Sequence, residues 1–396
     1  MIKNIGISQT LKINEMCKDL KNQNKNVYNY GFGQSPFKPP SFLQNEIIKN
    51  MDKNSYLPVQ GLLELRSSIT RHYQNFHNVK IDKDDIIIGP GSKELLCLLN
   101  LSIDNKIYFI APYWVSYVNQ LKVYNRDNYE IIQTTYENKW KITLEQVKKL
   151  DDNSFILINN PNNPTGLVYS YDELKNIVDV CRSKNITIIS DEIYQYINFN
   201  NEFNTLLSLY PENTIISNGL SKWCHSGGYR FGYMIFPEKL FELKKKVICA
   251  SSETFSSVNT PLQYGTISVF DNFKELILYN KNKIKCLKMY NEYFHKRLTQ
   301  MNIKVHKGEG AFYMYLDFGN YSDKLKNKNL NNDSEFCTKL LDDTGIAMLP
   351  GNAFGIGYGY TTRFALTNFT FDSDLNNISS NNIVGMNLLN EWLNNL

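Results

Sequence analysis

Between about residues 85 and 236, short apolar segments alternate with helical patterns, and this alternation constrains the fold more than any other feature. The segments are rich in Ile, Val, Phe and Tyr and are bounded by Gly, Pro or Asn. Continuous apolar strands of this kind are typical of a parallel sheet that helices cover on both faces. The expected strands are Ile86–Ile88, Ile107–Ile110, Phe155–Ile158, Ile186–Ile189, Thr214–Ser217 and Tyr229–Phe236. Helical patterns over Lys93–Leu101 and Tyr171–Ser183 lie between them, and Ser170 is a typical N-cap for the second. The pattern therefore predicts an α/β domain.

After about residue 265 the pattern changes, which indicates a second and smaller domain. A long amphipathic stretch from Gln263 towards Arg297 predicts one long helix. The elements expected after it are a strand over Ala311–Phe318, a polar loop over Asn320–Asp333, a helix over Ser334–Asp343, strands near Ile346–Leu349 and Arg363–Thr367, and a helix over about Asn382–Leu393. We therefore expect a large domain over residues 38–265 and a small α+β domain built from residues 1–37 and 266–396.

The composition is that of an ordinary globular protein, with 42% apolar and 21% charged residues. The net charge is +4 and no basic block stands out, which argues against nucleic acid as a partner. No stretch approaches the roughly 18 apolar residues of a membrane span, and the N-terminus has no signal-peptide pattern. The seven cysteines show neither CxxC spacing nor clustering with histidine. We therefore expect a cytoplasmic protein with reduced thiols and no bound metal.

Polar and glycine-rich residues follow several of the predicted strands, at the edge where ligands bind to open parallel sheets. Gly89-Pro90-Gly91-Ser92-Lys93 opens a predicted helix, whose free N–H groups and dipole favour a phosphate. Asp191 ends another strand, and Lys222 follows a third. Each feature alone has an ordinary explanation, because such turns, helix caps and exposed lysines are common. Their combination is more specific than any one of them.

The order and spacing of these residues resemble the class I/II aminotransferases, which are fold type I pyridoxal-phosphate enzymes. The matching motifs are Asn163-Pro164-Thr165-Gly166, Asp191-x-x-Tyr194, Ser221-Lys222 with Arg230 eight residues after the lysine, Pro350-Gly351-x-x-Phe354-Gly355 followed by Arg363, Gly33 with Pro36-Phe37, and Tyr56-x-x-x-x-Gly61-x-x-x-Leu65-Arg66. The resemblance covers about residues 30 to 370. It implies a large domain with a mostly parallel seven-stranded sheet between helices, a smaller C-terminal α+β domain, and pyridoxal 5′-phosphate as the cofactor.

The resemblance also implies roles for the catalytic residues. Lys222 carries the cofactor as a Schiff base and then moves a proton between the substrate and the cofactor. Asp191 pairs with the pyridine nitrogen and keeps it protonated, which improves the ring as an electron sink. Tyr194 and Asn163 hydrogen-bond the ring oxygen. Trp114 stacks on the ring face.

The implied phosphate site combines backbone N–H groups with one guanidinium. Its residues are Gly91, Ser92, Lys93, Arg230, Ser221 and, from the neighbouring subunit of a homodimer, Tyr56. Arg363 clamps the substrate α-carboxylate as a fork, with Gly33 and Asn163 beside it.

The substrate side chain stays open at the level of the sequence. No arginine lies between Ser251 and Gln263, where some aspartate-specific members supply one, and this weakens a dicarboxylate substrate. Lys93 occupies the position that reaches a distal carboxylate in another branch of the family. Aromatic residues near the expected site permit an aromatic or aliphatic substrate instead; they are Phe32, Phe37, Tyr113, Phe312 and Tyr313.

The chain departs from the family pattern after the lysine. His225, Ser226, Gly227 and Gly228 stand where small or aliphatic residues are usual, and Phe231 replaces an aliphatic residue. These changes remove no catalytic group, and a structural role is the better interpretation of His225.

The best hypothesis is an aminotransferase that transfers an amino group from an amino acid to a 2-oxo acid through pyridoxamine phosphate. A lyase or cyclase on the same scaffold is the alternative, and a non-catalytic binding module is the third reading.

Overall fold

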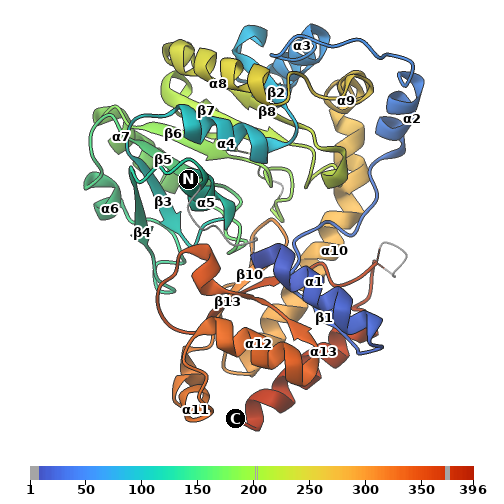
Figure 1. Cartoon of the computed structure of the whole chain (residues 1–396), viewed down its shortest axis with the longest axis vertical. Coiled ribbons are helices and arrows are strands. Elements are labelled where there is room, and N and C mark those ends of the chain that lie inside the picture. The colour runs from blue at the N-terminus through green and yellow to red at the C-terminus, as the bar shows by residue number, and fades with distance from the viewer. Residues whose placement is uncertain (1–8, 201, 203, 371–374) are drawn as a thin grey trace.

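A seven-stranded sheet forms the centre of one half of the computed structural model, which describes residues 9–200, 202, 204–370 and 375–396 (Figure 1). In spatial order the strands are β2 (Ile86–Gly89), β8 (Gly232–Ile235), β7 (Thr214–Gly219), β6 (Thr187–Asp191), β5 (Phe155–Asn159), β3 (Ile107–Ala111) and β4 (Tyr129–Gln133). Only β8 runs antiparallel to its neighbours. The expected mostly parallel seven-stranded sheet is confirmed.

The apolar segments form strands because helices bury both faces of the sheet. Alternate residues along each strand point to opposite faces. Phe109 and Leu157 share one apolar cluster with α4 (Ser92–Ser102), α5 (Ser116–Val123) and α8 (Phe241–Thr254). Tyr108 and Ile156 share another with α6 (Leu144–Lys148) and α7 (Tyr171–Ser183). The expected cap is present, since the Ser170 hydroxyl accepts from the N–H of Glu173 in a capping box at the start of α7.

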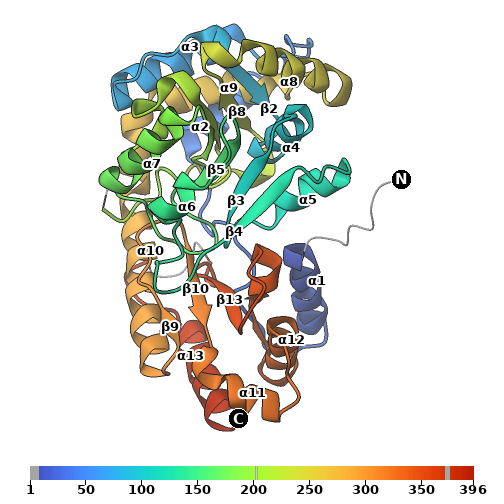
Figure 2. The same cartoon turned by 90° about the vertical axis from the view of Figure 1, so that its left-hand side faces the viewer.

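A four-stranded antiparallel sheet forms the second half, in the order β12 (Leu349–Pro350), β13 (Thr361–Ala365), β10 (Tyr313–Asp317) and β9 (Lys304–Val305). Figures 1 and 2 show α10 (Phe273–Gln300) running along the molecule from the first half to this sheet. The remaining elements are α1 (Gln9–Asn22), β1 (Tyr28–Asn29) paired with β11 (Ile346–Ala347), α2 (Ser41–Lys49), α3 (Leu63–His72), α9 (Thr260–Asp271), α11 (Ser322–Asn327), α12 (Asp333–Thr344) and α13 (Ser380–Asn394).

Three expectations about single elements are wrong. The stretch from Gln263 to Arg297 forms two helices that meet at Asn272, whose ψ of 36° is not helical. Within the expected loop after Asn320, α11 forms because Leu325 is buried under it. The strand expected from Tyr229 starts at Gly232 instead, because residues 227–229 form a 3₁₀ turn. The half-exposed edge strand β4 has no continuous apolar run and was not expected.

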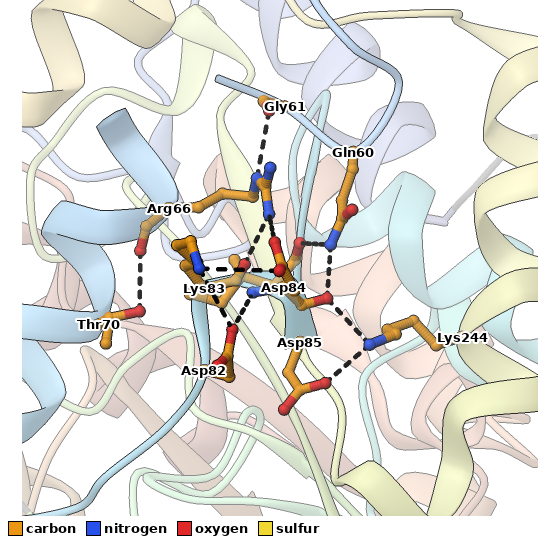
Figure 3. A network of polar contacts seen from close by, with 10 residues as sticks. Gln60, Gly61, Arg66, Thr70, Asp82, Lys83, Asp84, Asp85 and Lys244 are labelled. Carbon is orange, nitrogen blue, oxygen red and sulfur yellow. Dashed lines mark hydrogen bonds and ion pairs between the residues drawn. The ribbon is translucent and has the colours of Figure 1, made fainter. Parts of the chain in front are cut away.

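A polar network anchors the segment after Tyr56 against the turn that precedes β2 (Figure 3). Arg66, whose side chain is 8% exposed, donates to the carbonyls of Gly61 (3.2 Å) and Lys83 (2.8 Å) and to the carboxylate of Asp84 (2.9 Å). The amide of Gln60 donates to the carbonyl of Asp84 at 2.7 Å. The guanidinium fork therefore fixes the loop beside the first strand of the large sheet.

Candidate active site

A cavity of about 520 Å³ opens where the carboxyl ends of the parallel strands face the four-stranded sheet. Asp191 ends β6, Lys222 follows β7, Asn163 follows β5 and Trp114 follows β3. The predicted residues that line this cavity are Gly33, Ser92, Lys93, Trp114, Asn163, Asp191, Tyr194, Ser221, Lys222, Arg230 and Arg363. The structure therefore brings together eleven of the thirteen predicted site residues, and Gly91 and Tyr56 are the two that do not line it.

Lys222 extends into the cavity, and its amine donates to the carbonyl of Gly33 at 2.8 Å. Burial, helped by the charges of Arg363 and Arg230 and opposed by that of Asp191, lowers the pKa of Lys222 to about 8. An ordinary lysine has a pKa of about 10.4. A much larger share of the Lys222 amines is therefore uncharged near neutral pH, which is the form that attacks a carbonyl carbon.

Asp191 is a buried carboxylate at the floor of the cavity, 3% exposed. It accepts a hydrogen bond from the hydroxyl of Tyr117 (2.5 Å) and one from the backbone N–H of Ile193 (3.2 Å). Burial outweighs these hydrogen bonds and the charge of Lys222, which act in the opposite direction, and raises the pKa of Asp191 to about 6. Within the described ranges no cation contacts the carboxylate, so it is suited to pair with a protonated nitrogen of a ligand.

Tyr117 was missed at the level of the sequence, although it holds Asp191. Its N–H donates to the carbonyl of Trp114 at 3.0 Å, in the first turn leading to α5. The three-residue spacing from Trp114 was the available signal, because residues three apart in a helical turn lie on one face.

Tyr194 and Asn163 present polar groups on another side of the cavity. The hydroxyl of Tyr194 lies 2.8 Å from that of Tyr313, and burial keeps the pKa of Tyr194 well above its usual value. The side-chain oxygen of Asn163 accepts from Arg363 at 3.2 Å, which leaves its amide N–H groups as donors. Both side chains therefore approach the cavity uncharged.

The β2–α4 turn and Arg230 form the basic end of the cavity. Gly91 caps α4 with φ of +92°, and an added Cβ there would lie 2.3 Å from the guanidinium of Arg230. Arg230 donates to the carbonyls of Gly227 (2.9 Å) and Pro90 (3.3 Å). The helix N-terminus, which starts with Ser92, and the guanidinium converge on one place, and this arrangement suits a phosphate group.

Arg363 lies on β13 and is 2% exposed. It donates to the carbonyl of Gly31 at 2.7 Å, and its Nε has no hydrogen-bond partner among the described residues. The guanidinium carbon lies 4.6 Å from the ring centre of Tyr313. A Cβ added at Gly33 would lie 2.0 Å from the Tyr313 hydroxyl, which explains the need for glycine there. A buried guanidinium with a free N–H suits a carboxylate ligand.

Lys93 and Trp114 lie together at the cavity mouth, with the amine 5.6 Å from the ring centre. Burial and the charge of Arg230 lower the pKa of Lys93.

Of the aromatic residues expected near the site, Phe32 and Tyr313 line the cavity, but Phe37, Tyr113 and Phe312 do not. Phe231 is buried in the apolar core and does not line the cavity either. Tyr56 is 91% exposed outside the cavity, so its cross-subunit role stays a prediction.

This fold and this set of side chains define a fold type I pyridoxal-phosphate enzyme, and three comparisons agree. A family model described as aminotransferase class I and II matches residues 22–371, so the chain belongs to that family. A Streptococcus mutans protein named asparagine--oxo-acid transaminase is 29% identical over 94% of this chain and 96% of its own. A probable aspartate/prephenate aminotransferase from Aquifex aeolicus is 31% identical over 89% and 90%. The crystal structure of an aspartate aminotransferase from Thermotoga maritima matches with a TM-score of 0.85 and 25% identity over 99% of both chains.

The protein is therefore an aminotransferase that uses pyridoxal phosphate to move an amino group from an amino acid to a 2-oxo acid. The cavity residues fit this cofactor. Lys222 supplies a buried amine for its aldehyde carbon, and Asp191 supplies, for its ring nitrogen, a carboxylate that no cation in the described part of the chain contacts. Arg230 and the start of α4 supply a cationic cradle for its phosphate.

The depressed pKa of Lys222 is testable without the cofactor. We expect trace acetylation of the cofactor-free protein across a pH series, read by peptide mass spectrometry, to give Lys222 a midpoint of about 8. Because only the uncharged amine reacts, its labelling rises at lower pH than that of exposed lysines, whose midpoint is about 10.4. Arg363→Met removes one of the two neighbouring positive charges and is expected to raise the midpoint. A Lys222 midpoint equal to that of exposed lysines would contradict the buried environment.

Proposed function

We propose that this aminotransferase acts through Lys222, Asp191 and Tyr194 as catalytic residues and Arg363, Asn163 and Gly33 as substrate-binding residues. The observation that carries the proposal is the convergence of a buried amine, a buried carboxylate and a buried guanidinium on one cavity. Bound pyridoxal phosphate supplies the electron sink that stabilises the carbanion formed when the substrate α-proton leaves. The rest of the chemistry falls to the side chains of this chain.

Arg363 binds the α-carboxylate of the amino acid and orients its Cα–H bond towards the amine of Lys222. That amine would accept the α-proton and later give it up to the cofactor, which suits a base whose pKa is about 8. Asp191 would keep the ring nitrogen of the bound cofactor charged, and the hydroxyl of Tyr117 holds the carboxylate in place at 2.5 Å. Tyr194 and the amide of Asn163 would donate hydrogen bonds to the ring oxygen.

The phosphate site of this proposal comprises Gly91, Ser92, Lys93, Ser221 and Arg230, and Trp114 stacks on the ring. We further propose a homodimer in which Tyr56 completes the phosphate site of the neighbouring subunit. Its support is the exposure of Tyr56 (91%), Met51 (63%) and Ile48 (68%). In addition, Ile48 lines a groove together with Tyr229, the residue before Arg230. Sedimentation of the cofactor-loaded protein at the mass of a single chain would exclude this assembly.

The two-domain division at residues 38–265, with 1–37 and 266–396 as the small domain, belongs to the same proposal and is supported by the two larger sheets, which share no strand.

A role in amino acid biosynthesis and a cytoplasmic location are proposed as well. The location is supported by the seven cysteines, all of which are free thiols. None of the helices in the described part of the chain is long and apolar enough to cross a membrane. Fractionation of the source cells with an antibody against the chain tests the compartment.

For the substrate, we propose an amino donor that carries a polar group at the end of a short side chain, as aspartate and asparagine do. The amine of Lys93 lies at the cavity mouth and forms no ion pair with a carboxylate of the described residues. The relatives named for aspartate and asparagine are in line with such a donor. The amine would donate a charge-assisted hydrogen bond to the distal carboxylate or amide oxygen.

A half-reaction distinguishes transamination from elimination or cyclisation. The cofactor-loaded protein is mixed with one amino acid and no acceptor, across a panel of donors. We expect 2-oxo acid formation to stop at one equivalent per subunit, because the amino group stays on the cofactor as pyridoxamine phosphate. A lyase or cyclase regenerates the cofactor, so its product would exceed one equivalent. If no donor changed the cofactor absorbance, the non-catalytic reading would replace the enzyme.

Replacing Lys93 tests the substrate proposal. We expect Lys93→Met to lower kcat/KM for aspartate by about 10- to 100-fold, the usual worth of a hydrogen bond to a charged group, and to change kcat/KM for alanine little. Lys122→Met, on an exposed part of α5, is the matched control and leaves both values unchanged. An equal loss for both donors would refute the specificity role and assign the amine to cofactor binding.

A further inference from the structure

His225 stands three residues after Lys222, in the turn between β7 and β8, and the mechanism above does not use it. Its ring lies between two parts of the chain that are distant in sequence. One ring nitrogen, Nδ1, lies 2.7 Å from the hydroxyl of Ser35, and the other, Nε2, lies 2.9 Å from the side-chain oxygen of Asn280 on α10. The ring of Phe37 packs edge-on against it at 5.2 Å. His225 therefore links the N-terminal segment, the Lys222 turn and α10.

The direction of each hydrogen bond follows from its neighbours. The amide nitrogen of Asn280 donates to the carbonyl of Trp223 at 2.7 Å, so the amide oxygen faces His225 and accepts. The Nε2 of His225 must then carry a proton. Burial lowers the pKa of His225 to about 4, so near neutral pH its Nδ1 is bare and accepts from the hydroxyl of Ser35. The direction of both bonds to the His225 ring is therefore defined, and the Ser35 oxygen also accepts from the N–H of Phe37 at 3.4 Å.

The segment held by Ser35 forms one wall of the active-site cavity. Phe32, Gly33 and Gln34 line the cavity just before Ser35. The carbonyl of Gly31, in the same segment, accepts from Arg363 at 2.7 Å. A displacement of this segment would therefore change both the cavity wall and the support of the guanidinium that binds the substrate carboxylate.

Two hydrogen bonds join this segment to the Lys222 turn in the described structure, and only one of them uses a group that takes part in the reaction. The amine of Lys222 donates to the carbonyl of Gly33, but the proposed function assigns that amine to the cofactor. The bond between Ser35 and His225 involves no group that the reaction uses. It is therefore the contact that stays in place when the amine of Lys222 is engaged.

We propose that His225 is a positioning residue that fastens residues 31–37 over the active-site cavity through Ser35 and thereby sets the affinity for the amino acid. It touches neither the reacting atoms nor the cofactor in this role. The inference rests on the proposed function of Lys222 and Arg363 and extends it to a residue at which this chain departs from its family's pattern.

The test measures steady-state kinetics and backbone hydrogen exchange in Ser35→Ala and His225→Asn. Asparagine is chosen because residue 225 has φ of 54°, which asparagine tolerates better than most residues. Since Ser35→Ala loses the hydrogen bond to His225, we expect KM for the amino donor to rise about threefold to tenfold while kcat changes less than twofold. The rise should be at least as large in His225→Asn, which also loses the bond to Asn280. Amides of residues 31–37 should exchange faster in the cofactor-loaded protein, and the cofactor absorbance should stay unchanged.

Two variants that leave the bond between Ser35 and His225 in place serve as controls. Ser35→Thr keeps the hydroxyl and should retain the wild-type KM, and Ser183→Ala, at the exposed end of α7, should do so too. The double variant Ser35→Ala/His225→Asn should be no worse than His225→Asn alone, because both substitutions remove the same bond between Ser35 and His225. Additive losses, a fall in kcat at unchanged KM, or unchanged exchange in residues 31–37 would each overturn the proposal.

A cofactor-free arm separates this proposal from the proposed function. In Lys222→Ala the bond to Gly33 is absent, so the Ser35–His225 contact alone joins the segment to the turn. Adding Ser35→Ala to Lys222→Ala should therefore speed exchange of residues 31–37 more than adding it to the cofactor-free wild-type chain. This result is independent of any catalytic activity, and equal effects in the two backgrounds would refute the positioning role.

Discussion

Three buried ionisable side chains face one cavity, and in the described structure none of them contacts a side chain of opposite charge. Lys222, Asp191 and Arg363 come from three different strands or turns, and each has only neutral hydrogen-bond partners. Burying such groups without partners opposes folding, so the surrounding sheets must stabilise them. A cofactor with an aldehyde and a cationic ring nitrogen gives Lys222 and Asp191 their partners. A substrate with a carboxylate gives Arg363 its partner. The unpaired charges therefore explain both the cofactor and the substrate class.

The two sheets are needed together because each supplies part of this arrangement. The large sheet places Asp191 and Lys222 at the ends of neighbouring strands β6 and β7, and the small sheet places Arg363 on β13. The N-terminal segment closes the wall between them, since the carbonyl of Gly31 supports Arg363 and that of Gly33 accepts from Lys222. His225 connects this segment to α10, so the geometry of the cavity depends on contacts well outside it.

Sequence patterns predicted what depends on local periodicity and motif spacing. The strands buried on both faces were found because their apolar runs are continuous, whereas the edge strand β4 was missed because one of its faces is exposed. The break at Asn272 was missed because amphipathic periodicity continues across it. Residues such as Asp191 and Arg230 were found because their order and spacing match the motifs of the aminotransferase family. Partners created by tertiary contacts were not, as the bond between Ser35 and His225 spans 190 residues and Tyr117 contacts Asp191 across 74.

The proposed mechanism depends on a covalent bond between Lys222 and the cofactor, which reductive trapping detects. The cofactor-loaded protein is treated with borohydride, digested and mapped by mass spectrometry, since reduction fixes the bond between the cofactor and its lysine. We expect one phosphopyridoxyl group per chain, attached to Lys222. Attachment to another lysine, or no attachment in a protein that binds the cofactor, would contradict it.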